Sequence, residues 1–242
     1  MRLDKFLVST GKLSRSEAGR AARAGRVSVN GVVEKHADRA IDPERDNIAL
    51  DGAPIRYQQF TYILLNKPDG YVSATEDGRD PTVLELLPEE LRRIGLFPCG
   101  RLDKHTLGLM LLTNDGQLGH RLLSPRHHVE KHYAYACRDA LSPEDCHAME
   151  SGVVLDDGYR TKPARILPRD AYSGTIVLTE GKYHQIKRMF EAVGNKITAL
   201  ERTCFGPLVL PPSMERGAWR SLTDEEIDAL RASDRDAPAR PV

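Results

Sequence analysis

The chain has 242 residues, of which 40% are hydrophobic and 29% charged, and its 35 basic and 35 acidic side chains balance at neutral pH. This length and composition are ordinary for a soluble protein of one large or two smaller domains. No apolar run approaches the roughly 18–20 residues of a membrane span, and the N-terminus has no secretory signal pattern. The four cysteines form no CxxC pair, which argues against a disulfide framework or a zinc finger and predicts a cytoplasmic protein with reduced thiols.

The N-terminal part of the chain is basic: residues 1–36 hold eight basic side chains and three acidic ones. An apolar stripe over 3–7 predicts a short helix, the capping box S-x-x-E at 14–17 predicts a second helix over 15–24, and Asn30-Gly31 predicts a hairpin turn. Arginines on a surface helix usually form a solvated face. Here they precede a hairpin that can support a concave basic surface, so we predict binding of RNA or DNA. The candidate contacts are Arg2, Lys5, Arg15, Arg20, Arg23 and Arg26.

The rest of the chain alternates strand and helix patterns. Turn residues from Asp51 onward predict a linker over 52–60. The predicted strands are 61–67, 107–113, 131–137 and 173–181, and the predicted helices are 84–93 (one or two), 117–123, 184–194 and 222–231. The polar, proline-rich tail over 232–242 is expected to be disordered.

The common metal and nucleotide motifs are not matched. The histidine-rich stretch 127–132 is neither HExxH nor HxxEH, and in a strand His128 and His132 would lie about 13 Å apart, too far to share one ion. Gly181-Lys182 does not form a P-loop, and no GxGxxG occurs. We therefore expect neither a metal nor a cofactor.

The stretch GRLDKHTLGLMLLTNDG, residues 100–116, places the carboxylate of Asp103 before a predicted buried strand. An aspartate in a loop is most often a turn or capping residue. A lone carboxylate beside an RNA-binding segment also suits attack on a nucleoside, whereas glycosidases generally use two acids. Such a site needs a cation beside the carboxylate and an aromatic ring that stacks on a flipped-out base. The aromatic candidates are Tyr133, Tyr135 and Tyr183, and the cationic ones are Lys187, Arg188 and Arg101.

These residues resemble a known family. GRLDKHTLGLMLLTNDG closely resembles the catalytic motif G-R-L-D-x-x-T-x-G-L-L-L-L-T-N-D-G of pseudouridine synthases, with Met110 as a conservative departure in the apolar run. NKPDGYVSA, KHYAY and GKYHQIKRMF resemble the other motifs of the family, and residues 1–50 resemble the S4 RNA-binding module of its RsuA-type branch.

The resemblance implies an α+β fold. A small α/β S4 RNA-binding domain at 1–51 and a linker at 52–60 would precede a larger catalytic domain at 61–231, with a disordered tail at 232–242. The catalytic domain would contain a mixed, mainly antiparallel sheet flanked by helices.

The resemblance also implies the roles of individual residues. Asp103 matches the nucleophile, and Tyr133 matches the tyrosine that stacks on the target base and takes part in the proton step at C5. Lys187 matches the basic partner of the aspartate, with neighbouring Arg188 as the alternative. The further substrate-binding candidates are Arg101, Arg188, Asn66 and Lys67.

The motifs before Tyr133 and around Lys187 look most like the small-subunit group of this branch. They favour 16S rRNA as the substrate and partner, either naked or in a partly assembled small subunit, with 23S rRNA as the alternative. A monomer that needs no cofactor is expected. A non-catalytic S4-containing assembly factor remains a competing hypothesis, which an intact set of Asp103, Tyr133 and Lys187 disfavours. A generic glycosidase is disfavoured because the motif carries no second acid.

Overall fold

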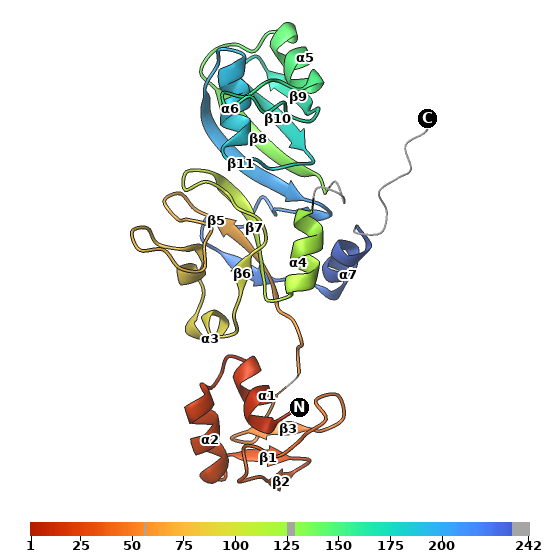
Figure 1. Cartoon of the computed structure of the whole chain (residues 1–242). Helices are drawn as coiled ribbons and strands as arrows, with labels where there is room; N and C mark the ends of the chain where they lie inside the picture. The colour runs from red at the N-terminus through yellow and green to blue at the C-terminus, as the bar shows by residue number, and fades with distance from the viewer. Residues whose placement is uncertain (56, 125–128, 234–242) are drawn as a thin grey trace. The chain divides into compact units, whose positions relative to one another are not determined.

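The computed structural model of the chain describes residues 1–55, 57–124 and 129–233 (Figure 1). The chain divides into two compact units, which we treat separately. The N-terminal unit contains residues 1–61 and 84–97, and the main unit contains residues 62–83 and the chain from 98 onward. His127, His128 and the end of the predicted tail, 234–242, lie outside the described residues.

The N-terminal unit packs two helices on a small sheet. Its elements are α1 (Leu3–Ser9), α2 (Arg15–Arg23), β1 (Val27–Val29), β2 (Val32–Val33), β3 (Ile48–Leu50) and β4 (Ala53–Ile55), and the antiparallel sheet order is β2-β1-β3-β4. The predicted capping box at α2 is present, since Glu17 N donates to Ser14 Oγ and Ser14 N donates to Glu17. Ala18, Ala21 and Ala22 of α2 are buried against Phe6 of α1, which leaves the arginines of α2 exposed.

The boundary of this unit differs from the sequence prediction in two ways. The expected linker over 52–60 is wrong at its start, because β4 pairs with β3 and extends the sheet to Ile55. β4 has only three residues, which is too short for its alternating pattern to be distinguished from a turn that contains glycine and proline. Residues 84–97, expected in the larger domain, group with the N-terminal unit, where Arg93 pairs with Glu17 at 3.7 Å.

In the part of the chain that the structure describes, the main unit contains one nine-stranded sheet with the order β13-β5-β7-β11-β8-β10-β9. β12 pairs with β11 and β6 pairs with β7. The strands are β5 (Tyr62–Lys67), β6 (Phe97–Pro98), β7 (Leu107–Thr113), β8 (Lys131–Cys137), β9 (Arg165–Asp170), β10 (Ser173–Leu178), β11 (Ile197–Phe205), β12 (Leu208–Val209) and β13 (Trp219–Ser221). Along the order β13-β5-β7-β11-β8-β10-β9, only the contact between β7 and β11 is parallel, and β12 is antiparallel to β11, which confirms the expected mixed, mainly antiparallel sheet.

Helices flank this sheet, as expected for an α+β fold. They are α4 (Gly116–Leu123), α5 (Pro143–Ser151), α6 (Gln185–Ala192) and α7 (Asp224–Ala232). Between β5 and β6 the chain also forms a 3-10 turn η1 (Val83–Leu86) and α3 (Glu89–Arg92), of which residues 84–92 belong to the N-terminal unit. Figure 1 shows α5 and α6 beside β8, β9 and β10, and α4 beside α7. Tyr62 of β5 connects α4 to the sheet, because its hydroxyl donates a hydrogen bond to Asp115, the N-cap of α4, at 2.7 Å. No helix among the described residues is long and apolar enough to cross a membrane.

The sheet brings β7 and β11 unusually close at Gly108. Its φ is +98°, and a Cβ there would lie 2.3 Å from Arg202 O and 2.9 Å from Arg202 N. Arg202 pairs with Gly108 on β7 and with Tyr133 on β8, so this position joins the two halves of the sheet. The glycine in the TLGL stretch is therefore required by the backbone of the neighbouring strand as well as by its own conformation.

Replacement of Gly108 by alanine is expected to destabilise the main unit by about 3 kcal/mol, because the methyl group meets a backbone that cannot yield. The fluorescence of Trp219, the only tryptophan in the chain, reports on this sheet during urea unfolding. Gly116→Ala is the control, since a Cβ at Gly116 meets nothing within 4 Å. Equal unfolding midpoints for the two variants would contradict the argument.

Candidate active site

Asp103 lies in the loop between β6 and β7, and main-chain contacts fix this loop. Leu102 N donates to Ser73 Oγ at 3.0 Å, and the same hydroxyl donates to Leu102 O at 2.8 Å. Thr106 N donates to Asp103 O at 3.0 Å, which closes a tight turn just before the strand. The backbone on both sides of Asp103 is therefore held, and its side chain is left half-buried, 24% exposed.

The ammonium of Lys67 binds main-chain carbonyl groups of the same loop. This side chain has no exposed surface, and its ammonium donates to Lys104 O at 2.9 Å, Thr106 O at 2.9 Å and Pro68 O at 3.2 Å. Burial lowers the pKa of Lys67 to about 8, although Asp69 and Asp103 act in the opposite direction. Its predicted role as a direct substrate contact is wrong, because a fully buried ammonium saturated by carbonyls has no access to RNA.

Two basic side chains approach the carboxylate of Asp103. Lys187 Nζ lies 2.7 Å from Oδ2, and His184 Nε2 lies 3.5 Å from Oδ1. Both come from α6 or its N-cap, and the apolar face of this helix is buried on the sheet through Ile186, Met189 and Phe190. One short helix therefore presents both groups to the loop before β7.

Arg188 points elsewhere. Its guanidinium contacts Asp156 and lies 2.8 Å from Asp157, and the hydrogen bonds with Asp157 and Asp156 raise the pKa of Arg188. Of the two residues that the sequence left open, the structure brings Lys187 to Asp103. Arg188 instead binds two acids in the segment after α5.

Tyr133 lies on β8 and is 9% exposed. It shares a face of the strand with Tyr135, whose ring packs on Phe190 of α6 with centroids 5.0 Å apart. The face of the sheet that carries Tyr133 is thus the face covered by α6, which also carries Lys187.

The two remaining substrate-binding candidates differ in exposure. Arg101 is exposed, two residues before Asp103. Asn66 is 3% exposed, donates to Met214 O at 2.7 Å and accepts from Arg216 at 2.7 Å. Direct substrate binding by Asn66 is therefore wrong in this structure: its amide joins β5 to the chain before β13.

Sequence reasoning missed three residues at or near the site. Ser73 lies in a loop and belongs to no periodic pattern, and His184, at the N-cap of α6, lies within the predicted helix 184–194 but was not assigned a role. Arg202 is 1% exposed, donates from Nε to Leu109 O at 2.7 Å and lies over the Phe205 ring at 5.2 Å. The polar residues in ITALERTCF make this central strand hard to recognise in the sequence. The only sequence feature connected with Arg202 is Gly108, where the neighbouring strand comes close. Among the described residues, no cluster of three or more His, Cys, Asp or Glu side chains could hold a metal ion.

Comparison with known proteins decides the family. The profile of the RNA pseudouridylate synthase family matches residues 61–192, and that of the S4 domain matches residues 1–46. The chain belongs to the RNA pseudouridylate synthase family. It is therefore an isomerase with an N-terminal S4 domain, and the family expected from the sequence motifs is confirmed.

Close relatives cover nearly the whole chain. An uncharacterized RNA pseudouridine synthase of Bacillus subtilis, YtzG, is 45% identical over 95% of this chain and 98% of its own length. The ribosomal small subunit pseudouridine synthase A of Escherichia coli K12 is 42% identical over 95% of this chain and all of its own length. A crystal structure of a pseudouridylate synthase, 39% identical, covers 95% of this chain and 99% of its own, with a TM-score of 0.68.

Lys187→Met is expected to lower kcat for pseudouridine formation by about 100-fold, since it removes the cation nearest to the Asp103 carboxylate. Lys187→Arg is expected to retain much of the activity because it keeps the positive charge. Lys196→Met, which removes an exposed lysine after α6, is the matched control. An unchanged kcat in Lys187→Met would show that the ion pair has no part in the reaction.

Proposed function

We propose that this chain isomerises one uridine of 16S rRNA to pseudouridine, with Asp103 as the nucleophile and without a cofactor. The single observation that carries the chemistry is the half-buried Asp103 carboxylate, fixed by its loop and approached by Lys187 and His184. The choice of RNA is supported by the relatives named ribosomal small subunit pseudouridine synthase A, at 42% identity over nearly the full length. Uridine 516 is the target that the resemblance of the sequence motifs to the small-subunit group implies.

The reaction breaks the N1–C1′ bond of uridine and forms a C5–C1′ bond. N1 gains a proton and C5 loses one, so no external reactant is consumed. Asp103 either attacks C1′ directly or assists cleavage to a glycal-like species, and both routes need the same carboxylate beside the ribose. The released uracil turns within the site before it rejoins the sugar through C5.

Neighbouring residues have distinct roles in this proposal. Lys187 orients the Asp103 carboxylate through the 2.7 Å ion pair. Tyr133, on the face of the sheet covered by α6, stacks on the flipped-out base and takes part in removal of the C5 proton. Arg101, exposed in the same loop as Asp103, contacts the RNA strand.

The S4 domain supplies the RNA affinity in this proposal. Arg15, Arg20 and Arg23 lie exposed on α2, where they can contact successive phosphates. Arg2 and Arg26 are also exposed, but each is paired with a carboxylate, Asp4 and Asp51 respectively. Lys5 is exposed on α1. We further propose that the protein acts as a monomer in the cytoplasm, on free rRNA or on a partly assembled small subunit.

Asp103→Asn is expected to abolish turnover, because the amide keeps the shape of the side chain but is not a nucleophile. The measurement is tritium release from 16S rRNA labelled at uridine C5, with 23S rRNA in parallel and Asp228→Asn as an exposed control. Release from 23S rRNA alone would keep the chemistry and change the substrate. RNA binding with no release from either RNA or from partly assembled subunits would favour a non-catalytic assembly factor.

The double variant Arg20→Glu/Arg23→Glu is expected to weaken rRNA binding at least 10-fold. It should also reduce the slope of log affinity against log salt concentration by about 2, since two phosphate contacts are lost. Arg45→Glu changes an arginine that is 88% exposed elsewhere in the same unit and serves as the control. A salt dependence equal to that of the unaltered protein would contradict RNA binding by the α2 arginines.

A further inference from the structure

Tyr183 is the most exposed large hydrophobic side chain among the described residues, yet it immediately precedes a residue that contacts Asp103. We propose that its outer face is a stacking platform for the nucleobase that flanks the target uridine. This inference rests on the proposed function, because it assigns the position of a neighbouring nucleotide when a uridine occupies the site at Asp103.

Asp103, His184 and Tyr183 follow one another outward from the site. The imidazole of His184 reaches Asp103 Oδ1 at 3.5 Å on one side, and its ring stacks on Tyr183 with centroids 3.8 Å apart and planes inclined by 18°. Tyr183 is 73% exposed. One face of the tyrosine ring is therefore occupied by the histidine, and the other is left for a planar ligand.

The backbone holds this pair in place before any RNA arrives. His184 has φ +49°, in the left-handed region that non-glycine residues rarely adopt, and this bend turns its ring under that of Tyr183. Arg188 donates to Tyr183 O at 3.3 Å while its guanidinium is fixed by Asp156 and Asp157. A residue held strained beside a catalytic group is typical of a functional position.

A buried network supports the segment that leads into this pair. Glu180 is 8% exposed and accepts from Gln185 Nε2 at 2.6 Å, Tyr159 Oη at 2.7 Å and Lys162 N at 2.9 Å. Lys182 N donates to the Gln185 side chain at 2.8 Å. Because residues 180–185 are fixed at both ends, Tyr183 can keep its outward orientation without a packing partner on its outer face.

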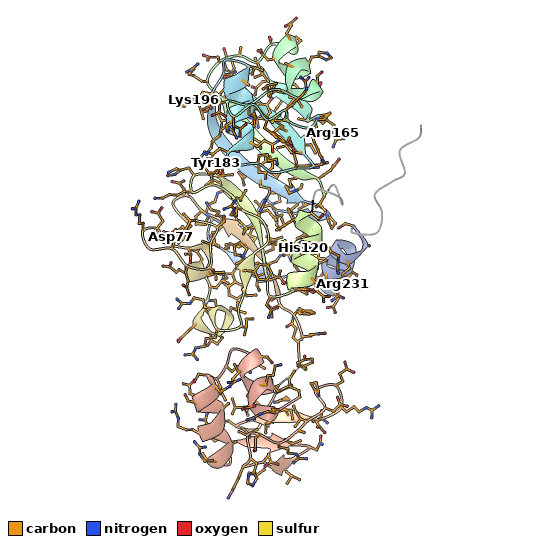
Figure 2. The ribbon with its side chains drawn as sticks, in the orientation of Figure 1. Asp77, His120, Arg165, Tyr183, Lys196 and Arg231 are labelled. Atoms are coloured by element: carbon orange, nitrogen blue, oxygen red, sulfur yellow. The ribbon has the colours of Figure 1, made fainter. Side chains whose placement is uncertain are left out.

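The position of the ring suits a nucleotide next to the target. Figure 2 shows Tyr183 between the half of the sheet formed by β5 and β7 and the half covered by α6. A uridine that reaches Asp103 brings its strand neighbours close to His184, and Tyr183 is the exposed aromatic ring that stacks on this histidine. Lys182, exposed and next to Tyr183 in the chain, adds positive charge that attracts the phosphates. Aromatic rings stack on any base, so the platform would position the strand without selecting its sequence.

The test compares Tyr183→Ala, Tyr183→Phe and Tyr172→Ala in the full-length protein by tritium release from 16S rRNA. Tyr172, 54% exposed on the turn between β9 and β10, is the matched control. Tyr183→Ala is expected to raise KM about 5- to 100-fold, the range for loss of one base–aromatic stack, with kcat within about twofold of the unaltered protein. Tyr183→Phe is expected to restore KM because it keeps the ring. Tyr172→Ala is expected to behave as the unaltered protein.

A second measurement identifies the stacked nucleotide. An abasic site placed on the 5′ or the 3′ side of the target in an RNA fragment should weaken binding by the unaltered protein but not by Tyr183→Ala. An unchanged KM in Tyr183→Ala, or equal losses in Tyr183→Ala and Tyr183→Phe, would overturn the inference. So would a fall in kcat at constant KM, which would make the tyrosine a support for His184 only. Those results leave the proposed function intact, whereas an unaltered protein inactive on every rRNA overturns both.

Discussion

The burial of one lysine ammonium governs the geometry of the active site. Lys67 has no exposed surface, so its positive charge must be balanced by polar atoms within the protein. Its ammonium donates hydrogen bonds to the carbonyl groups of Lys104 and Thr106. These residues lie on either side of His105 in the loop that contains Asp103. Only a tight turn can direct both carbonyl groups toward the Lys67 ammonium. The same turn orients the Asp103 side chain toward α6. Without the ammonium Thr106 O would lose this hydrogen bond, and Lys104 O would keep the one from Gly70 N.

The active site is assembled from the two halves of the sheet, and β11 joins them. Asp103 comes from the loop before β7, and Lys187 comes from the helix that follows β10. β11 lies between β7 and β8 and runs parallel to the first and antiparallel to the second. The close approach of β11 to Gly108 sets the spacing between the two halves of the sheet. It thereby sets the distance between the Asp103 carboxylate and the Lys187 ammonium.

Local signals in the sequence predicted much of this structure. The strand at Leu107–Thr113 and the helices capped by Ser14 and Thr223 were found because their patterns depend on neighbours in the chain. β11 and α5 were missed, since the first mixes polar residues into a buried strand and the second has only a weak apolar face. Asp103 was found through its motif. The choice between Lys187 and Arg188 needed the structure, because it depends on two aspartates some 30 positions earlier in the chain.

The contacts that hold the Asp103 loop end mostly on main-chain atoms: Ser73 binds the backbone of Leu102, and Lys67 binds the carbonyls of Lys104 and Thr106. The side chain of Lys104 instead forms a partly exposed ion pair with Asp80, and that of His105 forms an exposed contact with Asp69, kinds of contact that contribute little to stability. Mutational drift at these two positions can therefore change the charge around the loop while the Asp103 carboxylate stays in place. A loop of this kind can change its preference among RNA substrates while the position of Asp103 stays the same.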